Sequence, residues 1–124
     1  MKNNPDLNTV CFNAEKVDHL RSALPAEIRL KRMARALKAA AHPARLAILS
    51  TLAIHEGCVC DVAHTLQMPV STASQHLRKL REAGLLEARA EGKLMIHSVV
   101  ESPLALTVIH GLEANVDANV EAVR

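Results

Sequence analysis

Three cysteines are the residues of this 124-residue chain whose type and spacing could do chemistry. Cys58 and Cys60 stand two positions apart, beside Asp61 at the start of a short helical pattern, and Cys11 lies near the N-terminus. The positive end of a helix favours the thiolate, the form of cysteine that binds metal. Because residues i and i+2 share a face only in extended chain, joint binding requires Cys58 to lie outside the helix, after a break at Gly57. A single cysteine is usually a small buried hydrophobic residue, but three in this arrangement favour metal binding.

The cysteines also indicate a compartment and a class of protein. The sequence has no secretory signal and no long apolar span, so we expect a cytoplasmic protein with reduced thiols and no membrane association. Metal binding or redox chemistry is then favoured over a structural disulfide. Cys-x-Cys differs from the Cys-x-x-Cys motif of thiol oxidoreductases, and no Cys/His pair follows from the sequence, so we expect no enzyme.

A second group of polar residues lies on a helix predicted after Met68-Pro69-Val70. Ala73, Leu77 and Leu80 form one apolar stripe, Ser71 is a good N-cap, and Gly84 suits the helix end. In a helix-turn-helix the start of the second helix meets base edges, while nearby Arg and Lys contact phosphates. The alternative for this helix alone is a solvated basic face. The predicted base readers are Ser71, Thr72, Ser74 and Gln75, and the other predicted DNA contacts are His76, Arg78, Lys79 and Arg81.

Two strand-like runs follow this helix. They cover residues 85–89 and 93–100 around Ala90-Glu91-Gly92, where glycine supplies the positive φ of a hairpin turn. A hairpin directly after the reading helix makes a winged helix-turn-helix, with the helix pair over 59–84 and the wing over 85–100. Arg89 and Lys93 lie beside the turn, so we expect the wing tip to contact phosphate or the minor groove.

The rest of the chain supplies elements that position these residues. Residues 1–16 are predicted to form an arm with a short helix from Asn13 or Ala14, and further helices are expected over 26–41 and from Pro43 to about residue 54. A C-terminal helix over 103–122 carries a long apolar row, which suits a dimer interface. The predicted fold class is mainly α with a β-hairpin wing, in a single domain over 1–124 that dimerises because its own core is small.

The distribution of charge agrees with a double-stranded nucleic-acid partner. The net charge is only +2, but residues 29–45 hold six Lys or Arg and no acid, whereas residues 101–124 hold four acids and one Arg. A basic region separated from an acidic tail suits a protein that approaches DNA from one side. Phe12 is the single aromatic residue, which argues against single-stranded nucleic acid because its binding relies on aromatic stacking.

These segments together resemble a known protein family. The run from Leu37 to Val100, with LKAAAHPARLAIL, CVCDVA, STASQHLRKLREAGLLEARAEGK and IHSV, looks like the ArsR/SmtB family of metal-responsive repressors. Residues 10–17 resemble the N-terminal arm of its CadC branch, which senses cadmium and lead. The resemblance implies a homodimer that binds operator DNA without metal and releases it when metal binds.

The resemblance also implies a metal site between subunits. By motif match its ligands are Cys11 from the arm of one subunit and Cys58 and Cys60 of the other. The branch has a further cysteine four residues before Cys11, where this chain has Leu7, so a fourth ligand is unassigned. Three thiolates suit Pb(II) or As(III), and also Cd(II) or Zn(II) if another donor completes the site. Cd(II) and Pb(II) rank first because of the arm resemblance.

The C-terminal helix departs from the family pattern. The family often carries a zinc site there, built from an Asp-x-His pair and a His-x-x-Glu pair. The matching positions here are residues 101–103 and 114–117, which read Glu-Ser-Pro and Ala-Asn-Val-Asp, so we predict that this site is absent. His97 and His110 lie nearby, but a lone histidine is more often structural than a ligand.

Two other functions remain open on the same scaffold. An As(III)-responsive repressor would use the same thiols. A redox-sensing repressor would release DNA when Cys11 forms a disulfide with Cys58 or Cys60 of the other subunit. A metal-buffering protein without DNA binding is disfavoured by the reading helix and wing.

Overall fold

The computed structural model describes residues 11–114, and the chain divides between Ala34 and Arg35 into two units. The N-terminal unit holds α1 (Ala14–Ala23) and the beginning of α2 (Glu27–Ala40). Asn13 caps α1, because its Oδ1 accepts a hydrogen bond from the Lys16 backbone N–H at 3.0 Å. These bounds confirm the helices predicted from residue 13 or 14 and over 26–41. Residues 1–10 of the predicted arm lie outside the described part of the chain.

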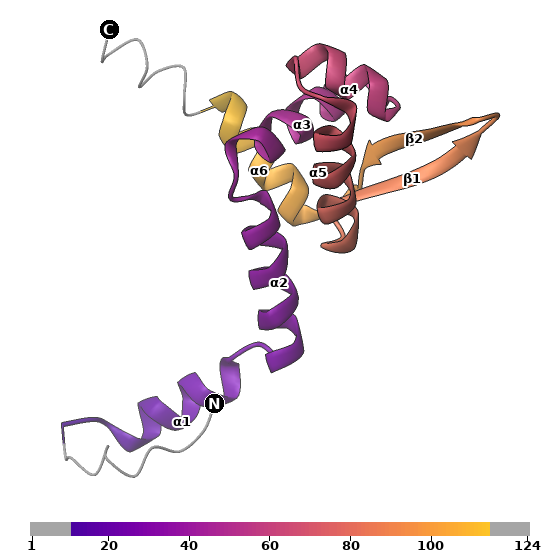
Figure 1. The fold of residues 1–124 in the computed structure, drawn as a ribbon. Helices are drawn as coiled ribbons and strands as arrows, with labels where there is room; N and C mark the ends of the chain where they lie inside the picture. Colours follow the sequence, from indigo (N-terminus) through magenta and orange to yellow (C-terminus); the bar gives the residue numbers. More distant parts are fainter. Residues whose placement is uncertain (1–10, 115–124) are drawn as a thin grey trace, which may run out of the picture. The chain divides into compact units, whose positions relative to one another are not determined.

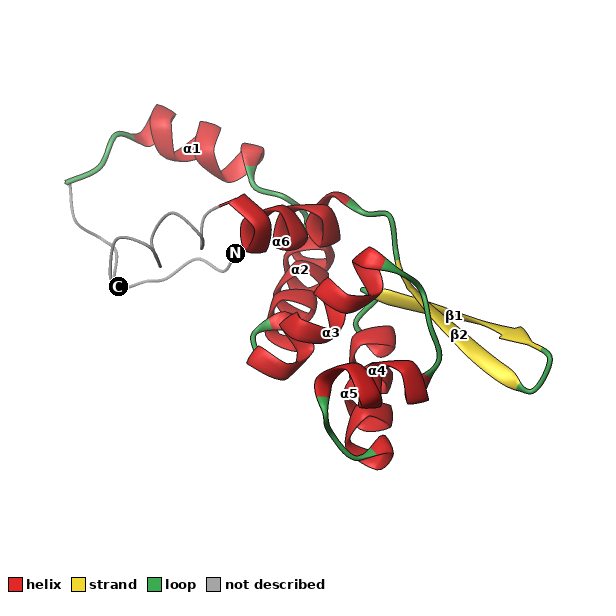
Figure 2. Ribbon diagram, turned by 90° about the horizontal axis from the view of Figure 1, so that it is seen from above, coloured by secondary structure: helices red, strands yellow, loops and turns green. Residues whose placement is uncertain are grey.

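The C-terminal unit is a helical body with a two-stranded antiparallel hairpin (Figure 1). Seen from above, the hairpin extends away from the helix pair that precedes it (Figure 2). Pro43 begins its first complete helix, as predicted. Only the part of the predicted C-terminal helix up to residue 114 is described. The elements are α3 (Pro43–Ile54), α4 (Val59–Leu66), α5 (Val70–Glu82), β1 (Leu86–Glu91), β2 (Leu94–Val99) and α6 (Pro103–Ala114).

The core of this unit confirms the predicted apolar stripe of the reading helix. Ala73, Leu77 and Leu80 are at most 1% exposed, so the polar residues of α5 are left on its outer faces. The stripe packs against buried residues of the neighbouring helices, which are Ile48, Leu49 and Leu52 of α3 and Val62 and Ala63 of α4. Burial of this stripe therefore sets which side chains α5 presents to solvent.

The start of α5 differs from the prediction. The helix begins at Val70 and its N-cap is Pro69, so the assignment of Ser71 as N-cap was wrong. Pro69 has φ −60°, close to the value that its ring imposes, and its carbonyl accepts the first helical hydrogen bond from the Ala73 N–H at 3.0 Å. The proline thus starts the helix earlier than predicted, and Ser71 lies inside the first turn with its side chain exposed.

The turn of the wing is also displaced from the prediction. The strands continue through Ala90 and Glu91, and Glu91 pairs with Leu94, so the turn consists of Gly92 and Lys93 rather than residues 90–92. Gly92 has φ +62° while Lys93 is not among the described residues with positive φ, as in a type II′ turn. A two-residue turn of this type matches the right-handed twist of the flanking strands, so the pairing of β1 with β2 continues up to Glu91 and Leu94, further than predicted. Lys93 consequently stands at the tip of the wing.

A short backbone bridge joins the loop before α4 to the wing. The Gly57 N–H donates to the His97 carbonyl at 3.1 Å, and the His97 N–H donates to the Gly57 carbonyl at 2.8 Å. A Cβ at residue 57 would lie 2.8 Å from the Asp61 Oδ2, so a side chain there would require the Asp61 carboxylate to shift. Glycine therefore brings the loop, α4 and β2 together at the position of the two cysteines.

The burial of the α5 stripe predicts the response to truncation. Leu80→Ala should lower the free energy of unfolding by about 2–5 kcal/mol, because it removes a fully buried side chain and leaves a cavity. Leu94→Ala is the control, since Leu94 is 53% exposed and should change stability little. Urea unfolding of the two variants and the wild type measures both effects. Equal decreases in the two variants would contradict the burial described above.

Candidate nucleic-acid interface and metal-ligating cysteines

The exposed side of α5 carries most of the predicted DNA-contacting residues. Ser71, Ser74 and Gln75 are exposed near its beginning, and Thr72 is half-buried. Arg78 and Lys79 follow, both exposed and both without an ion pair among the described residues. The helix therefore offers neutral hydrogen-bonding groups first and unpaired cations second. This is the order that contact with base edges and then with phosphates requires.

His76 differs from its neighbours because it contacts the protein itself. Its side chain is half-buried, its Nδ1 accepts a hydrogen bond from the Arg45 Nε at 3.2 Å, and its ring lies 4.9 Å from the ring of His42. Burial lowers the pKa of His76, and the charges of His42, Arg45 and Lys79 lower it further. A neutral His76 is the form that can accept from Arg45. Its predicted role in DNA contact stays a prediction, whereas its link between α5 and α3 was missed in the sequence.

Arg81 is exposed but is tied to the wing. Its Nη1 donates to the Nε2 of His97 at 2.6 Å. His97 is only 4% exposed, and its Nδ1 has no hydrogen-bond partner among the described residues. Burial, and then the charge of Arg81, lower the pKa of His97, so the imidazole is held neutral. This agrees with a structural rather than metal-binding His97, and it leaves Arg81 only in part available for phosphate.

Arg89 of β1 is likewise engaged within the chain. It forms a bidentate pair with Glu56, with distances of 2.5 and 2.7 Å, and its Nη2 lies 3.2 Å from the Glu91 carboxylate. The hydrogen bond from Arg89 lowers the pKa of Glu56, and the same pair raises the pKa of Arg89. Lys93 at the wing tip has no such partner among residues 11–114. Of the two predicted wing contacts, Lys93 is therefore the unpaired cation.

Cys58 and Cys60 both lie at the beginning of α4. Cys58 is the N-cap, with φ −88° and ψ 174°, so it stands outside the helix in extended backbone as joint binding requires. Its backbone N–H donates to the Asp61 Oδ2 at 2.9 Å, and hydrogen bonds from Cys58 lower the pKa of Asp61. Cys58 is buried and Cys60 is exposed.

Cys11 lies in the other unit, in the exposed segment before α1, so its predicted role as a ligand beside Cys58 and Cys60 stays a prediction. Among residues 11–114 of a single chain, no three His, Cys, Asp or Glu side chains are grouped so that they could hold a metal ion. The predicted loss of the C-terminal zinc site stays a prediction, because positions 115–117 lie outside the described residues.

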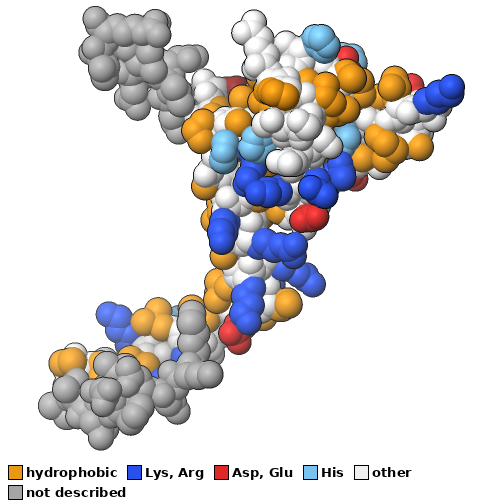
Figure 3. Space-filling model, viewed as in Figure 1, with side chains coloured by type: hydrophobic (Ala, Val, Ile, Leu, Met, Phe, Trp, Pro, Cys, Tyr) orange, Lys and Arg blue, Asp and Glu red, His pale blue; other side chains and the backbone are white. Residues whose placement is uncertain are grey.

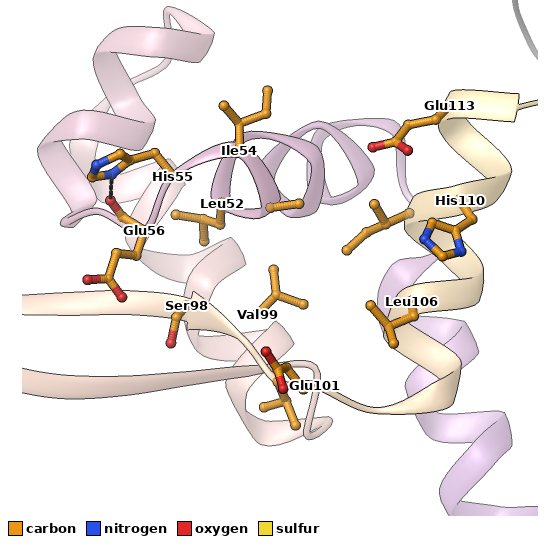
Figure 4. A pocket seen from close by; sticks show the side chains of 13 residues that line it. Leu52, Ile54, His55, Glu56, Ser98, Val99, Glu101, Leu106, His110 and Glu113 are labelled. Atoms are coloured by element: carbon orange, nitrogen blue, oxygen red, sulfur yellow. Dashed lines mark hydrogen bonds between the residues drawn. The ribbon is translucent and has the colours of Figure 1, made fainter.

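A hollow of about 400 Å³ lies between the end of α3, β2 and α6 (Figure 4). Its centre is lined by apolar side chains, including Leu52, Val99 and Leu106. The titratable groups come from three places, with His55 and Glu56 at one end of the hollow, Glu101 beside Val99, and His110 and Glu113 from α6.

Comparison with known proteins places these features in a family. The sequence model described as "Bacterial regulatory protein, arsR family" matches residues 42–88. The cadmium resistance transcriptional regulatory protein CadC of Listeria innocua is 30% identical over 99 residues, which cover 78% of this chain and 82% of that protein. A CadC homolog of Staphylococcus aureus is 40% identical over 68 residues, covering 54% and 56% of the two chains.

A solved structure has a similar fold. The homodimeric winged helix-turn-helix DNA-binding domain of Mb0332 from Mycobacterium bovis, described as a possible ArsR-family regulator, superposes with a TM-score of 0.65. It is 31% identical in sequence, and the match covers 77% of this chain and 90% of that domain. Within residues 11–114, no helix combines the length and the apolar character needed to cross a membrane.

The buried histidine predicts how stability depends on pH. Because the folded pKa of His97 lies below the ordinary value of about 6.5, the unfolded state binds more protons just below that pH, and stability falls as the pH drops from about 7 to 5. His97→Gln keeps an acceptor for Arg81 and should flatten this fall, although His76 contributes in the same direction. Urea unfolding across this pH range measures the effect, with His110→Gln as an exposed control. An undiminished fall in His97→Gln would show that His97 does not titrate in this way.

Proposed function

Because this chain belongs to the ArsR/SmtB family of DNA-binding transcriptional repressors, we propose that it is a metal-sensing member of the family. Its homodimer binds double-stranded operator DNA in the cytoplasm without metal. A thiophilic metal, Cd(II) or Pb(II) first and Zn(II) second, binds the cysteine thiolates and releases the DNA. Cadmium is supported by the names of the CadC relatives, and soft thiolate donors select these ions over Mg(II) and Ca(II).

The reading of DNA is assigned to α5 and the wing. Ser71, Ser74 and Gln75 are exposed on the first turns of α5 and offer the hydroxyl and amide groups that read base edges, with Thr72 beside them. Arg78, Lys79 and Lys93 have no ion pair among the described residues and suit phosphates. Arg81 and Arg89 are held by His97 and Glu56, so their contact with DNA requires them to exchange these partners.

The donor set fits a soft metal ion. Cys58 and Cys60 lie within one turn, and the extended backbone of Cys58 places it outside the helix that holds Cys60. Cys11 of the other subunit would supply the third thiolate, since the described part of one chain does not gather three ligands. Metal binding would thereby tie the arm of one subunit to the reading unit of its partner.

The contacts of the cysteine loop carry the proposal, because they connect the thiols to both DNA-reading elements. Gly57, next to Cys58, is bridged to the backbone of β2 at His97. The imidazole of His97 contacts Arg81 of α5, and Glu56 of the same loop holds Arg89 of β1. A shift of the loop must therefore disturb the wing, α5 or both. Allosteric couplings of this kind amount to about 1–3 kcal/mol, and linkage requires DNA to weaken metal binding by the same factor.

Two alternatives use the same residues. As(III) also suits three thiolates and would act as an effector at the same site. The exposure of Cys60 favours a redox alternative, because an accessible thiol can be oxidised to a disulfide with the arm of the partner subunit. Migration of the dimer on a non-reducing gel, with and without peroxide, separates oxidation from metal binding.

Cysteine variants test the sensing site. Cys58→Ser, Cys60→Ser and Cys11→Ser should each bind upstream DNA like the wild type but lose release by Cd(II) or Pb(II), because each removes one of three thiolates. Fluorescence anisotropy follows release, and ultraviolet charge-transfer absorption of the free protein follows thiolate–metal bonds. His64→Gln, an exposed change one helical turn after Cys60, is the matched control and should still release DNA when metal is added. If Cys58→Ser still released DNA on metal addition, Cys58 would not belong to the site. If no metal made the reduced wild type release DNA, the redox alternative would remain.

Two variants of α5 test the division between base and phosphate contacts. Arg78→Ala should weaken binding to specific and random duplex alike and lower the salt slope by about 1, since a phosphate contact carries little sequence information. Gln75→Ala should instead weaken the specific duplex by about 1–3 kcal/mol and leave random duplex unchanged. Anisotropy titrations at several salt concentrations measure both. If Arg78→Ala weakened binding to the specific duplex only, Arg78 would be a base reader and not a phosphate contact.

A further inference from the structure

A second basic surface lies beside the reading helix and extends beyond the residues that α5 and the wing contribute. It is a hollow of about 380 Å³ where the end of α2, the start of α3 and the end of α5 meet. Lys and Arg side chains gather on the side of the molecule that presents α5 (Figure 3). We call it the basic hollow, and its lining residues are Arg35, Lys38, Ala39, Arg45, Lys79, Glu82 and Ala83.

The cations of the basic hollow are not neutralised by the described part of the protein. Arg35, Lys38 and Lys79 form no ion pair among the described residues, in contrast to Arg89 of the wing. Glu82 is the single acid in the lining and is also unpaired there. Three elements thus bring four positive charges against one negative charge around one hollow.

Arg45 is held in position within this group. Its Nε donates to the Nδ1 of His76, and its Nη1 donates to the Ala39 carbonyl at 3.1 Å. These two bonds leave the remaining N–H groups of the guanidinium for an outside acceptor, and they reduce the entropy lost when an anion binds.

The position along α5 indicates where DNA would lie. Lys79 follows Ser71 by eight residues, which corresponds to a rise of about 12 Å along the helix, similar to the width of about 12 Å of the major groove. When Ser71 and Ser74 meet base edges, Lys79 therefore stands near the groove edge, where the phosphates run. Arg35, Lys38 and Arg45 lie around the same hollow, beyond the residues that contact bases.

We infer that the basic hollow binds the phosphate backbone of duplex DNA outside the base pairs read by α5, so that the end of α2 and the start of α3 lengthen the footprint of each subunit. This inference rests on the proposed DNA binding and adds a second contact region to it. The cations are exposed, except for the half-buried Arg45, so a free anion would be weakly held in a solvated site. A phosphate already held close by α5 avoids most of the cost of association, which favours DNA over a free anion.

The test uses the full-length reduced protein and a duplex selected by it from a random library. The duplex is made in two lengths, trimmed to the base pairs read by α5 and extended by about ten base pairs, one helical turn, on each side. Arg35→Ala/Lys38→Ala should bind the extended duplex more weakly than the wild type, with a salt slope reduced by about 0.9 for each phosphate that the variant no longer neutralises. On the trimmed duplex the two proteins should bind alike.

Two further variants make the result specific to the basic hollow. Glu82→Gln removes the negative charge of the basic hollow. It should therefore strengthen binding to the extended duplex, whereas Arg35→Ala/Lys38→Ala should weaken it. Lys31→Ala/Arg32→Ala removes the same charge from α2 outside the lining residues and should leave the slope unchanged. Thermal unfolding of all variants should match the wild type, because the substituted side chains are exposed.

The possible failures are distinguishable. If the wild type binds no duplex, the proposed function and this inference both fall. Two results with a wild type that binds would overturn the inference and leave the proposed function standing. One is an unchanged salt slope of the Arg35/Lys38 variant on the extended duplex. The other is a salt slope of the Lys31/Arg32 variant that falls as much as that of the Arg35/Lys38 variant. If inorganic phosphate raises the melting temperature of the wild type but not of the Arg35/Lys38 variant, while their salt slopes agree, the hollow holds a free anion and not DNA.

Discussion

The position of the reading helix relative to the cysteine loop depends on His97. Its backbone is bridged to Gly57, and its buried imidazole accepts from Arg81 of α5. The contact with Arg81 requires a neutral ring, because a protonated one would face the guanidinium in a site with little water. The wing, the loop that carries Cys58 and the last turn of α5 are therefore joined through one residue.

Gly57 lets this junction form without displacing Asp61, because it lacks a Cβ. Any larger residue would approach the carboxylate of Asp61, which accepts from the Cys58 N–H and caps α4. The cap and the bridge to β2 then define the backbone of the Cys-Val-Cys segment on both sides. A metal ligand placed in such a segment is sensitive to small movements of the helix pair, which is the property that a sensor needs.

The cations of the protein fall into two groups with different consequences. Arg81 and Arg89 are bound by His97 and Glu56, so they hold elements together, and Arg45 is bound by His76 but keeps N–H groups for an outside acceptor. Arg78, Lys79 and Lys93 have no such partner among the described residues and leave their charge for an outside anion. Such a division cannot be read from a count of basic residues, because the two groups alternate along the chain. It also explains how a protein with a net charge of +2 can present a strongly basic side.

The local pattern of the sequence by itself determined the elements and their order. The period of Ala73, Leu77 and Leu80 predicted a helix with one buried face, Pro43 marked a helix start, and the glycine before Lys93 marked a hairpin, since each signal acts over a few residues. The run from Leu37 to Val100, which includes the motif around Cys58 and Cys60, led to the family. Only the tertiary structure decided which polar residues are already engaged, because those partners lie far apart in sequence. His76 meets Arg45 across 31 positions and Arg89 meets Glu56 across 33, and no period or spacing encodes such contacts.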